Sequence, residues 1–159
     1  MERKTQVHAE AGKQELRITR QFGLPVELLF QAHTVPELVA QWMNTNVLRL
    51  EAKRHGSWQF ETTDAEGRVV FRANGVFHEF EPNRKITRTF EMENAPFAVQ
   101  LEFLEFEALS ADTSRLNMHL IFKSVALRDQ LLQMPFAAGL SMAHDRLEET
   151  AGRLLPPNS

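Results

Sequence analysis

The chain has 159 residues, a net charge of −3 and no cysteine. This length suits one domain that folds without metals or disulfides, and the missing thiols exclude disulfide bonds, thiolate metal sites and a cysteine nucleophile. Acidic and basic residues are interleaved along the sequence, so no basic face is expected to bind nucleic acid. The polar first residues and the lack of a long apolar run predict a cytoplasmic protein without a membrane span.

The first part of the chain predicts a strand followed by two helices. Residues 1–14 are charged and polar, and we expect them to form a flexible leader. Glu15–Phe22 alternates apolar and polar side chains, which predicts a first strand at the edge of a sheet. Pro25 favours a helix start, and Thr34 and Glu37 have the spacing of a capping box. Two short consecutive helices are therefore expected after the first strand.

Residues 47–124 predict an antiparallel sheet. Their apolar side chains alternate in the period of a strand, with turn signals rich in Gly, Pro, Asn and Asp between the runs. About six strands fit this segment, and the one-sided alternation predicts a sheet with one buried face. The apolar side changes after Phe103, where Leu104 and Phe106 take over, and this change indicates a β-bulge that curves the sheet.

After Ser124 the pattern becomes helical. Apolar and small side chains share a stripe about 100° wide, which predicts a long amphipathic helix that packs by one face. The stripe contains Phe136, Leu140, Ala143, Leu147, Thr150, Ala151 and Leu154. Pro156 and Pro157 cannot continue a helix, so residues 155–159 are expected to form a tail and residues 15–154 the single folded domain. The order of elements predicts an α+β domain with its last helix laid across the sheet.

Short strings spread over most of this domain carry a family resemblance. They are Pro25 with Thr34-Val-Pro-Glu-Leu38 and Trp42, His55-Gly-Ser-Trp58, Asp64-Ala-Glu-Gly67, Gly75-Val-Phe77, Pro82-Asn-Arg-Lys-Ile86 with Thr89-Phe90, and Gly139-Leu-Ser-Met-Ala-His-Asp-Arg-Leu147. In this order and spacing they resemble the helix-grip (START-like, SRPBCC) superfamily, and within it the family of proteins like the activator of Hsp90 ATPase homologue 1. The resemblance implies a curved antiparallel sheet, a long C-terminal helix packed across its concave face, and space for a ligand between them.

The sequence also departs from the family pattern. Trp42-Met-Asn44 stands where the family often has Trp-Trp-Gly, and Leu140 replaces an aromatic residue on the last helix. Arg88 and His144 are polar residues at positions that are usually apolar. These departures alter the cavity wall that the resemblance implies.

The predicted ligand-binding residues come from the inner face of the sheet and from the last helix. They are Trp58, Phe60, Phe71, Arg88, Phe90, Leu101, Phe103, Met118, Leu140, His144 and Leu147. Apolar walls with a few polar groups are typical of ligand pockets. The alternative is that the same residues fill the core completely.

Two polar candidates each have two interpretations. By alternation, Arg88 faces inward with Phe90, where it either binds a ligand carboxylate or phosphate or pairs with an internal acid or reaches water. His144 lies at the shoulder of the helical stripe, one turn before Glu148. The pair is either a proton-transfer site in which Glu148 raises the pKa of His144 or an ordinary surface pair.

The sequence favours binding over catalysis and predicts no catalytic residue, metal or cofactor. We expect a protein that holds a small hydrophobic or amphipathic ligand, as a monomer or a homodimer. One alternative is a co-chaperone-like module that acts on an Hsp90-type ATPase, and the chain itself lacks the P-loop needed to hydrolyse ATP. A further alternative is a polyketide cyclase-like enzyme, with His144 for acid–base chemistry and Arg88 as the oxyanion partner.

Overall fold

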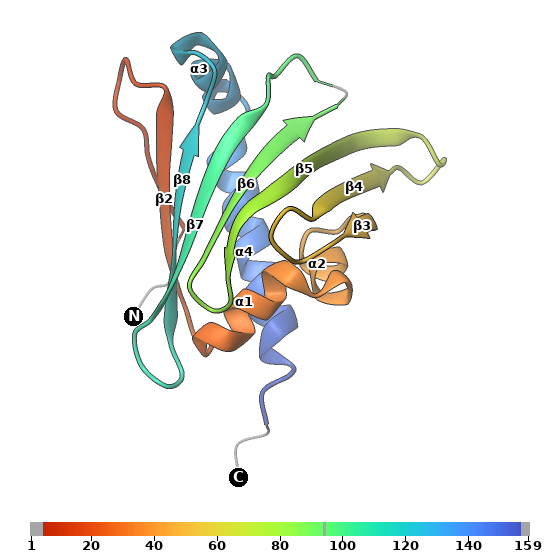
Figure 1. Cartoon of the computed structure of the whole chain (residues 1–159). Coiled ribbons are helices and arrows are strands. Elements are labelled where there is room, and N and C mark those ends of the chain that lie inside the picture. The colour runs from red at the N-terminus through yellow and green to blue at the C-terminus, as the bar shows by residue number, and fades with distance from the viewer. Residues whose placement is uncertain (1–4, 94, 157–159) are drawn as a thin grey trace.

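A computed structural model describes residues 5–93 and 95–156 of the chain (Figure 1). Its strands form one antiparallel sheet in the order β1-β2-β8-β7-β6-β5-β4-β3. Their bounds are β1 Gln6–His8, β2 Glu15–Phe22, β3 Asn46–Leu50, β4 Ser57–Thr63, β5 Val69–Glu81, β6 Lys85–Met92, β7 Gln100–Ala108 and β8 Ser114–Ile121.

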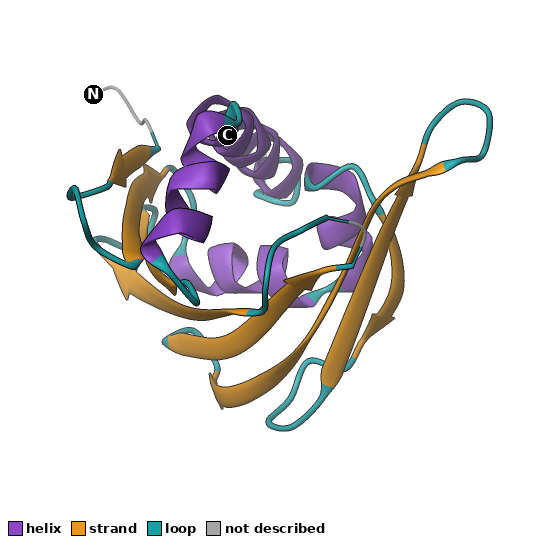
Figure 2. Ribbon diagram, turned by 90° about the horizontal axis from the view of Figure 1, so that it is seen from above, coloured by secondary structure: helices purple, strands orange, loops and turns teal. Residues whose placement is uncertain are grey.

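Two pairs of helices lie on the inner side of the curved sheet (Figure 2). The helices α1, Val26–Thr34, and α2, Pro36–Trp42, follow β2, whereas α3, Val125–Gln133, and α4, Phe136–Gly152, follow β8. The predicted α+β helix-grip fold is therefore confirmed, with two short helices after the first long strand and a long C-terminal helix. In the part of the chain that the structure describes, none of these helices is long and apolar enough to cross a bilayer.

The strand predicted at the edge of the sheet is β2, and this prediction is wrong because β2 pairs with β1 on one side and β8 on the other. Residues 6–8, expected to belong to a flexible leader, form β1 and pair with β2, so that Val7 lies opposite Ile18. Pairing satisfies the backbone groups that an edge strand leaves open. Residues 1–4 of the predicted leader and 157–159 of the predicted tail lie outside the described residues.

The predicted capping box does not form. Thr34 is the last residue of α1, and its hydroxyl donates to the Phe30 carbonyl at 3.2 Å. The N-cap of α2 is Val35, and Pro36 occupies the first turn, where its missing N–H costs nothing. The proline therefore fixes the start of α2 one residue later than the Thr-x-x-Glu spacing predicts.

The predicted bulge in β7 is also wrong. From Leu101 to Ala108, β7 pairs residue by residue with β8, and the register shifts lie instead in the β3–β4, β4–β5 and β5–β6 pairs. Regular alternation sends Glu102, Leu104 and Phe106 to the buried face. Leu101 and Phe103 consequently point to the opposite face of the sheet.

The apolar interior is divided into two clusters. The larger one joins the middle of the sheet to α1, α2 and α4 and includes Phe22, Trp58 and Leu147. The smaller one joins β2, β8 and α3 through Leu16, Ile18, Leu120, Phe122 and Leu131. Met118 is packed against both clusters. The sheet and α4 therefore enclose two packed regions with a boundary between them.

Candidate ligand-binding cavity

A cavity of about 240 Å³ lies where the two clusters meet. Its lining residues are Ile18, His33, Val39, Trp42, Met43, Phe60, Arg88, Phe90, Met92, Gln100, Glu102, Met118, Leu120, Leu131, Phe136, Leu140, Ala143 and His144. Most of these side chains are apolar. For comparison, an apolar cavity on the order of 150 Å³ holds benzene, so this one has room for a molecule of one or two rings.

The structure brings six of the predicted ligand-binding residues to this cavity: Phe60, Arg88, Phe90, Met118, Leu140 and His144. Trp58 and Leu147 lie in the larger cluster instead, and Phe71 packs against that cluster. The prediction that Leu101 and Phe103 line the cavity is wrong, because the regular pairing of β7 places both on the opposite face of the sheet. On that face the Phe103 ring lies 5.9 Å from the His119 ring.

Trp58 supports the cavity wall from behind. Its ring lies 4.7 Å from Phe60 and 5.4 Å from Phe90, both of which line the cavity. Gly75 on the neighbouring strand makes this position possible, because a Cβ there would lie 2.6 Å from the indole nitrogen. Trp58 therefore positions the two phenylalanines without lining the cavity.

Arg88 and Glu102 form a buried ion pair on the sheet side of the cavity. The two residues are directly opposite each other on β6 and β7, and Nε of Arg88 donates to Glu102 at 2.8 Å. Gln100 donates to the other carboxylate oxygen at 2.7 Å. The Arg88 guanidinium also lies 5.6 Å from the Trp58 ring centre. The interpretation of Arg88 as the partner of an internal acid is thus correct, and Arg88 also lines the cavity.

His33 is a cavity residue that the sequence reasoning missed. It comes from α1, one turn after buried Leu29, and its Nδ1 lies 2.9 Å from the Leu29 carbonyl. Burial is the largest cause that lowers the pKa of His33 to about 4, and Arg88 lowers it further. The imidazole is therefore neutral at physiological pH. Because a carbonyl only accepts, the proton is on Nδ1 and the lone pair is on Nε2.

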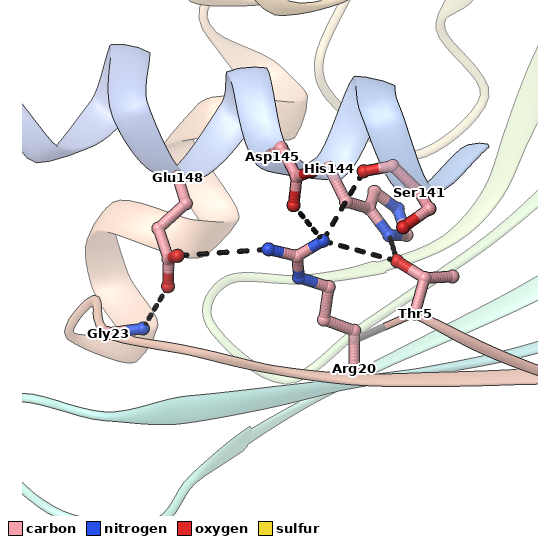
Figure 3. Close-up of polar contacts among 7 residues, drawn as sticks. All are labelled: Thr5, Arg20, Gly23, Ser141, His144, Asp145 and Glu148. Atoms are coloured by element: carbon pink, nitrogen blue, oxygen red, sulfur yellow. Dashed lines mark hydrogen bonds and ion pairs between the residues drawn. The ribbon is translucent and has the colours of Figure 1, made fainter. Parts of the chain in front are cut away.

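His144 is buried on α4 and does not form the surface pair that the sequence suggested (Figure 3). Its Nδ1 lies 2.7 Å from the Thr5 hydroxyl, and its ring packs edge-on against Phe22. Instead of the increase expected from Glu148, burial lowers the pKa of His144 to about 3, with smaller contributions from His33 and Arg20. His144 is thus a second neutral imidazole in the cavity wall.

Arg20 on β2 holds α4 against the first strands (Figure 3). One guanidinium nitrogen lies 2.8 Å from Asp145 and 3.4 Å from both the Ser141 carbonyl and the Thr5 hydroxyl. The other lies 3.7 Å from Glu148, which also accepts from the Gly23 backbone N–H. This network fixes the segment of α4 that carries His144.

The charges in the cavity wall cancel. Arg88 and Glu102 neutralise each other, and both histidines are uncharged near neutral pH. Within residues 5–93 and 95–156, no group of three or more acidic or histidine side chains is placed to hold a metal ion. The arrangement suits a mostly apolar ligand with few polar groups.

Comparison with known proteins gives one family match. The family model described as Activator of Hsp90 ATPase homolog 1-like protein matches residues 23–152. A search among curated proteins gave no match to the sequence.

Similar solved structures come from several bacteria. A Rhodobacter sphaeroides protein has a TM-score of 0.84 at 20% identity, over 95% of this chain and 99% of its own. A Mycobacterium smegmatis protein has a TM-score of 0.81 at 16% identity, over 98% and 99% of the two chains. A solution structure from Arthrobacter aurescens has a TM-score of 0.82 at 16% identity, over 96% and 93%. At these identities the likeness shows the shared fold.

Proposed function

The chain belongs to the Activator of Hsp90 ATPase homolog 1-like family, and on that premise we propose that it binds one small hydrophobic or amphipathic molecule between the sheet and α4. The observation that carries the proposal is the cavity of about 240 Å³ at the boundary of the two apolar clusters. Native cores are close-packed, and a void of this size has a cost in lost contacts. A bound molecule would restore those contacts.

Filling the cavity is expected to abolish binding. Ala143 lines it from α4, so Ala143→Phe places a ring in the space that a ligand would occupy. We expect ligand affinity to fall by at least about tenfold, while the midpoint of thermal unfolding stays near that of the parent. The measurement is thermal shift and calorimetry with a library of lipids, fatty acids and aromatic compounds.

The matched control is Ala137→Phe, an exposed position on the same helix that does not line the cavity. It should bind like the parent. Equal binding by the parent and Ala143→Phe would place the ligand elsewhere on the protein and refute the proposed cavity.

A second candidate function follows from the family name. A chain of this family would act on an Hsp90-type chaperone through its surface rather than through the cavity, and fold likeness does not carry that activity by itself. The discriminating measurement is the ATPase rate of a bacterial Hsp90 with and without the protein, together with its Ala143→Phe variant. Equal stimulation by both proteins would support the chaperone role, and an unchanged rate would remove it.

The polyketide cyclase-like alternative depended on His144 for acid–base chemistry, with Arg88 as the oxyanion partner. Nδ1 of His144 is engaged by Thr5, and the carboxylate of Glu148 faces Gly23 and Arg20. A neutral imidazole with a pKa of about 3 is a weak base. Binding without reaction is therefore the function that we propose.

A further inference from the structure

We propose that the ligand of this cavity is an uncharged molecule with a hydroxyl group, which it donates to Nε2 of His33. This inference rests on the proposed function and names the chemical class of the bound molecule. Its two supports are the fixed proton position on His33 and the charge balance of the wall.

His33 lines the cavity and has one nitrogen, Nε2, that can accept a hydrogen bond. Its Nδ1–H is committed to the Leu29 carbonyl at 2.9 Å, and edge-on contacts with Trp42 and Phe106, at 5.4 and 5.2 Å between ring centres, hold the ring in place. The structure records no partner for Nε2 among the residues it describes. With Nδ1 committed as a donor, Nε2 can only accept, and a hydroxyl is the group that donates a proton to it without adding charge.

The polar neighbours of His33 also fit an oxygen atom. Arg88 also lines the cavity; its Nε donates to Glu102 and its guanidinium lies over the Trp58 ring, so hydrogen-bond donors of the guanidinium remain uncommitted among the described residues. Both oxygens of Glu102 are engaged, by Arg88 and by Gln100. The wall therefore combines an acceptor at His33 with the donor character of Arg88, and this combination matches the donor and acceptor character of a hydroxyl.

Charge balance disfavours a carboxylate or phosphate. The positive charge of Arg88 is already neutralised by Glu102 at 2.8 Å, and His33 and His144 are uncharged. An anion buried here would have no unpaired cation, and an uncompensated buried charge is costly. A free acid is thus expected to bind less well than a neutral alcohol or phenol of the same size.

Four probes of one shape test this inference on the full chain: naphthalene, naphthol, methoxynaphthalene and naphthoate. Binding is measured by calorimetry at neutral pH. We expect naphthol to bind roughly threefold to tenfold more tightly than naphthalene, the contribution of about one hydrogen bond. Methoxynaphthalene keeps the oxygen but lacks the donor, so it should show no such gain. Naphthoate should bind at least about tenfold more weakly than naphthol.

His33→Phe retains an aromatic ring and removes the acceptor, so naphthol should bind this variant no more tightly than naphthalene binds it. His119→Phe, a half-buried position outside the cavity, should retain the preference for naphthol. If naphthalene binds but naphthol gains nothing over the ether, or if naphthoate binds most tightly, this inference fails and the proposed function stands. If none of the four probes binds, both fail. The comparison of probes on the parent protein remains decisive even if His33→Phe does not fold.

Discussion

Acidification from neutral pH is expected to reduce the free energy of unfolding by several kcal/mol before the carboxylates of the protein become neutral. Folding lowers the pKa of His33 from 6.5 to about 4 and that of His144 from 6.5 to about 3. The unfolded chain therefore binds protons at a higher pH than the folded chain does. The free energy of unfolding is retained above about pH 6.5 and falls as the pH decreases towards 4 and below. At about 1.4 kcal/mol per pKa unit, these shifts correspond to roughly 3 kcal/mol for His33 and roughly 5 kcal/mol for His144. Urea unfolding at a series of pH values measures the slope.

Variants assign this slope to the two buried rings. His33→Phe and His144→Phe keep an aromatic ring in each position, and together they should flatten the dependence between about pH 6.5 and 4. Because the two histidines influence each other, the effect of the double variant is expected to differ from the sum of the single ones. His78→Gln, at an exposed position on β5, is the control and should behave like the parent. A slope that survives in the double variant would assign the acid sensitivity to other groups.

Arg20→Met is expected to destabilise the protein by about 1–3 kcal/mol, because it removes a buried group that pairs with two carboxylates of α4 and donates to the Ser141 carbonyl. The Arg20 side chain is 2% exposed and bridges β2 to Asp145 and Glu148 on α4. Its guanidinium also lies 5.0 Å from the Phe22 ring centre. Methionine has no charge and therefore cannot make this cation–π contact. Denaturant unfolding at neutral pH gives the change in the free energy of unfolding.

The acidic partner provides the comparison for Arg20. The Asp145 side chain is 66% exposed and Glu148 still faces Arg20 when it is neutralised, so Asp145→Asn should cost less than Arg20→Met, about 1 kcal/mol. A double-mutant cycle between the two positions measures the interaction that they share. Near-parent stability of Arg20→Met would show that packing alone holds α4 on the sheet.

The fold could be predicted because the pattern of apolar residues is regular in most elements. On β6, strict alternation correctly turns Arg88 and Phe90 inward, and the stripe on α4 correctly buries Leu147. The confirmed family adds the order of the elements. These features depend on local periodicity, which a single sequence contains.

The site was harder to predict because it depends on pairing between distant residues. On β7 the alternation of apolar residues led us to predict that Leu101 and Phe103 face inward. The structure buries Glu102 because the β6–β7 register places Arg88 opposite it. That register is not visible in the sequence of either strand alone.

The two histidines illustrate the same limit. His33 shares a helical face with Leu29, a spacing that indicates burial but cannot say that a cavity lies next to it. The partner of His144 is Thr5, which lies 139 positions away in a segment that the sequence predicted to be flexible. Periodicity identifies a buried face, and only the tertiary fold identifies what that face contacts.

The cavity wall is assembled from nine different helices and strands or their ends, most of which contribute one or two side chains, such as Ile18 from β2, Phe60 from β4 and Leu131 from α3. A substitution at one of these positions changes the shape of the void while the backbone ladders and the opposite wall stay intact. Evolution can therefore retune such a domain for a new molecule in single steps, and a protein engineer can do the same when building a biosensor on this scaffold.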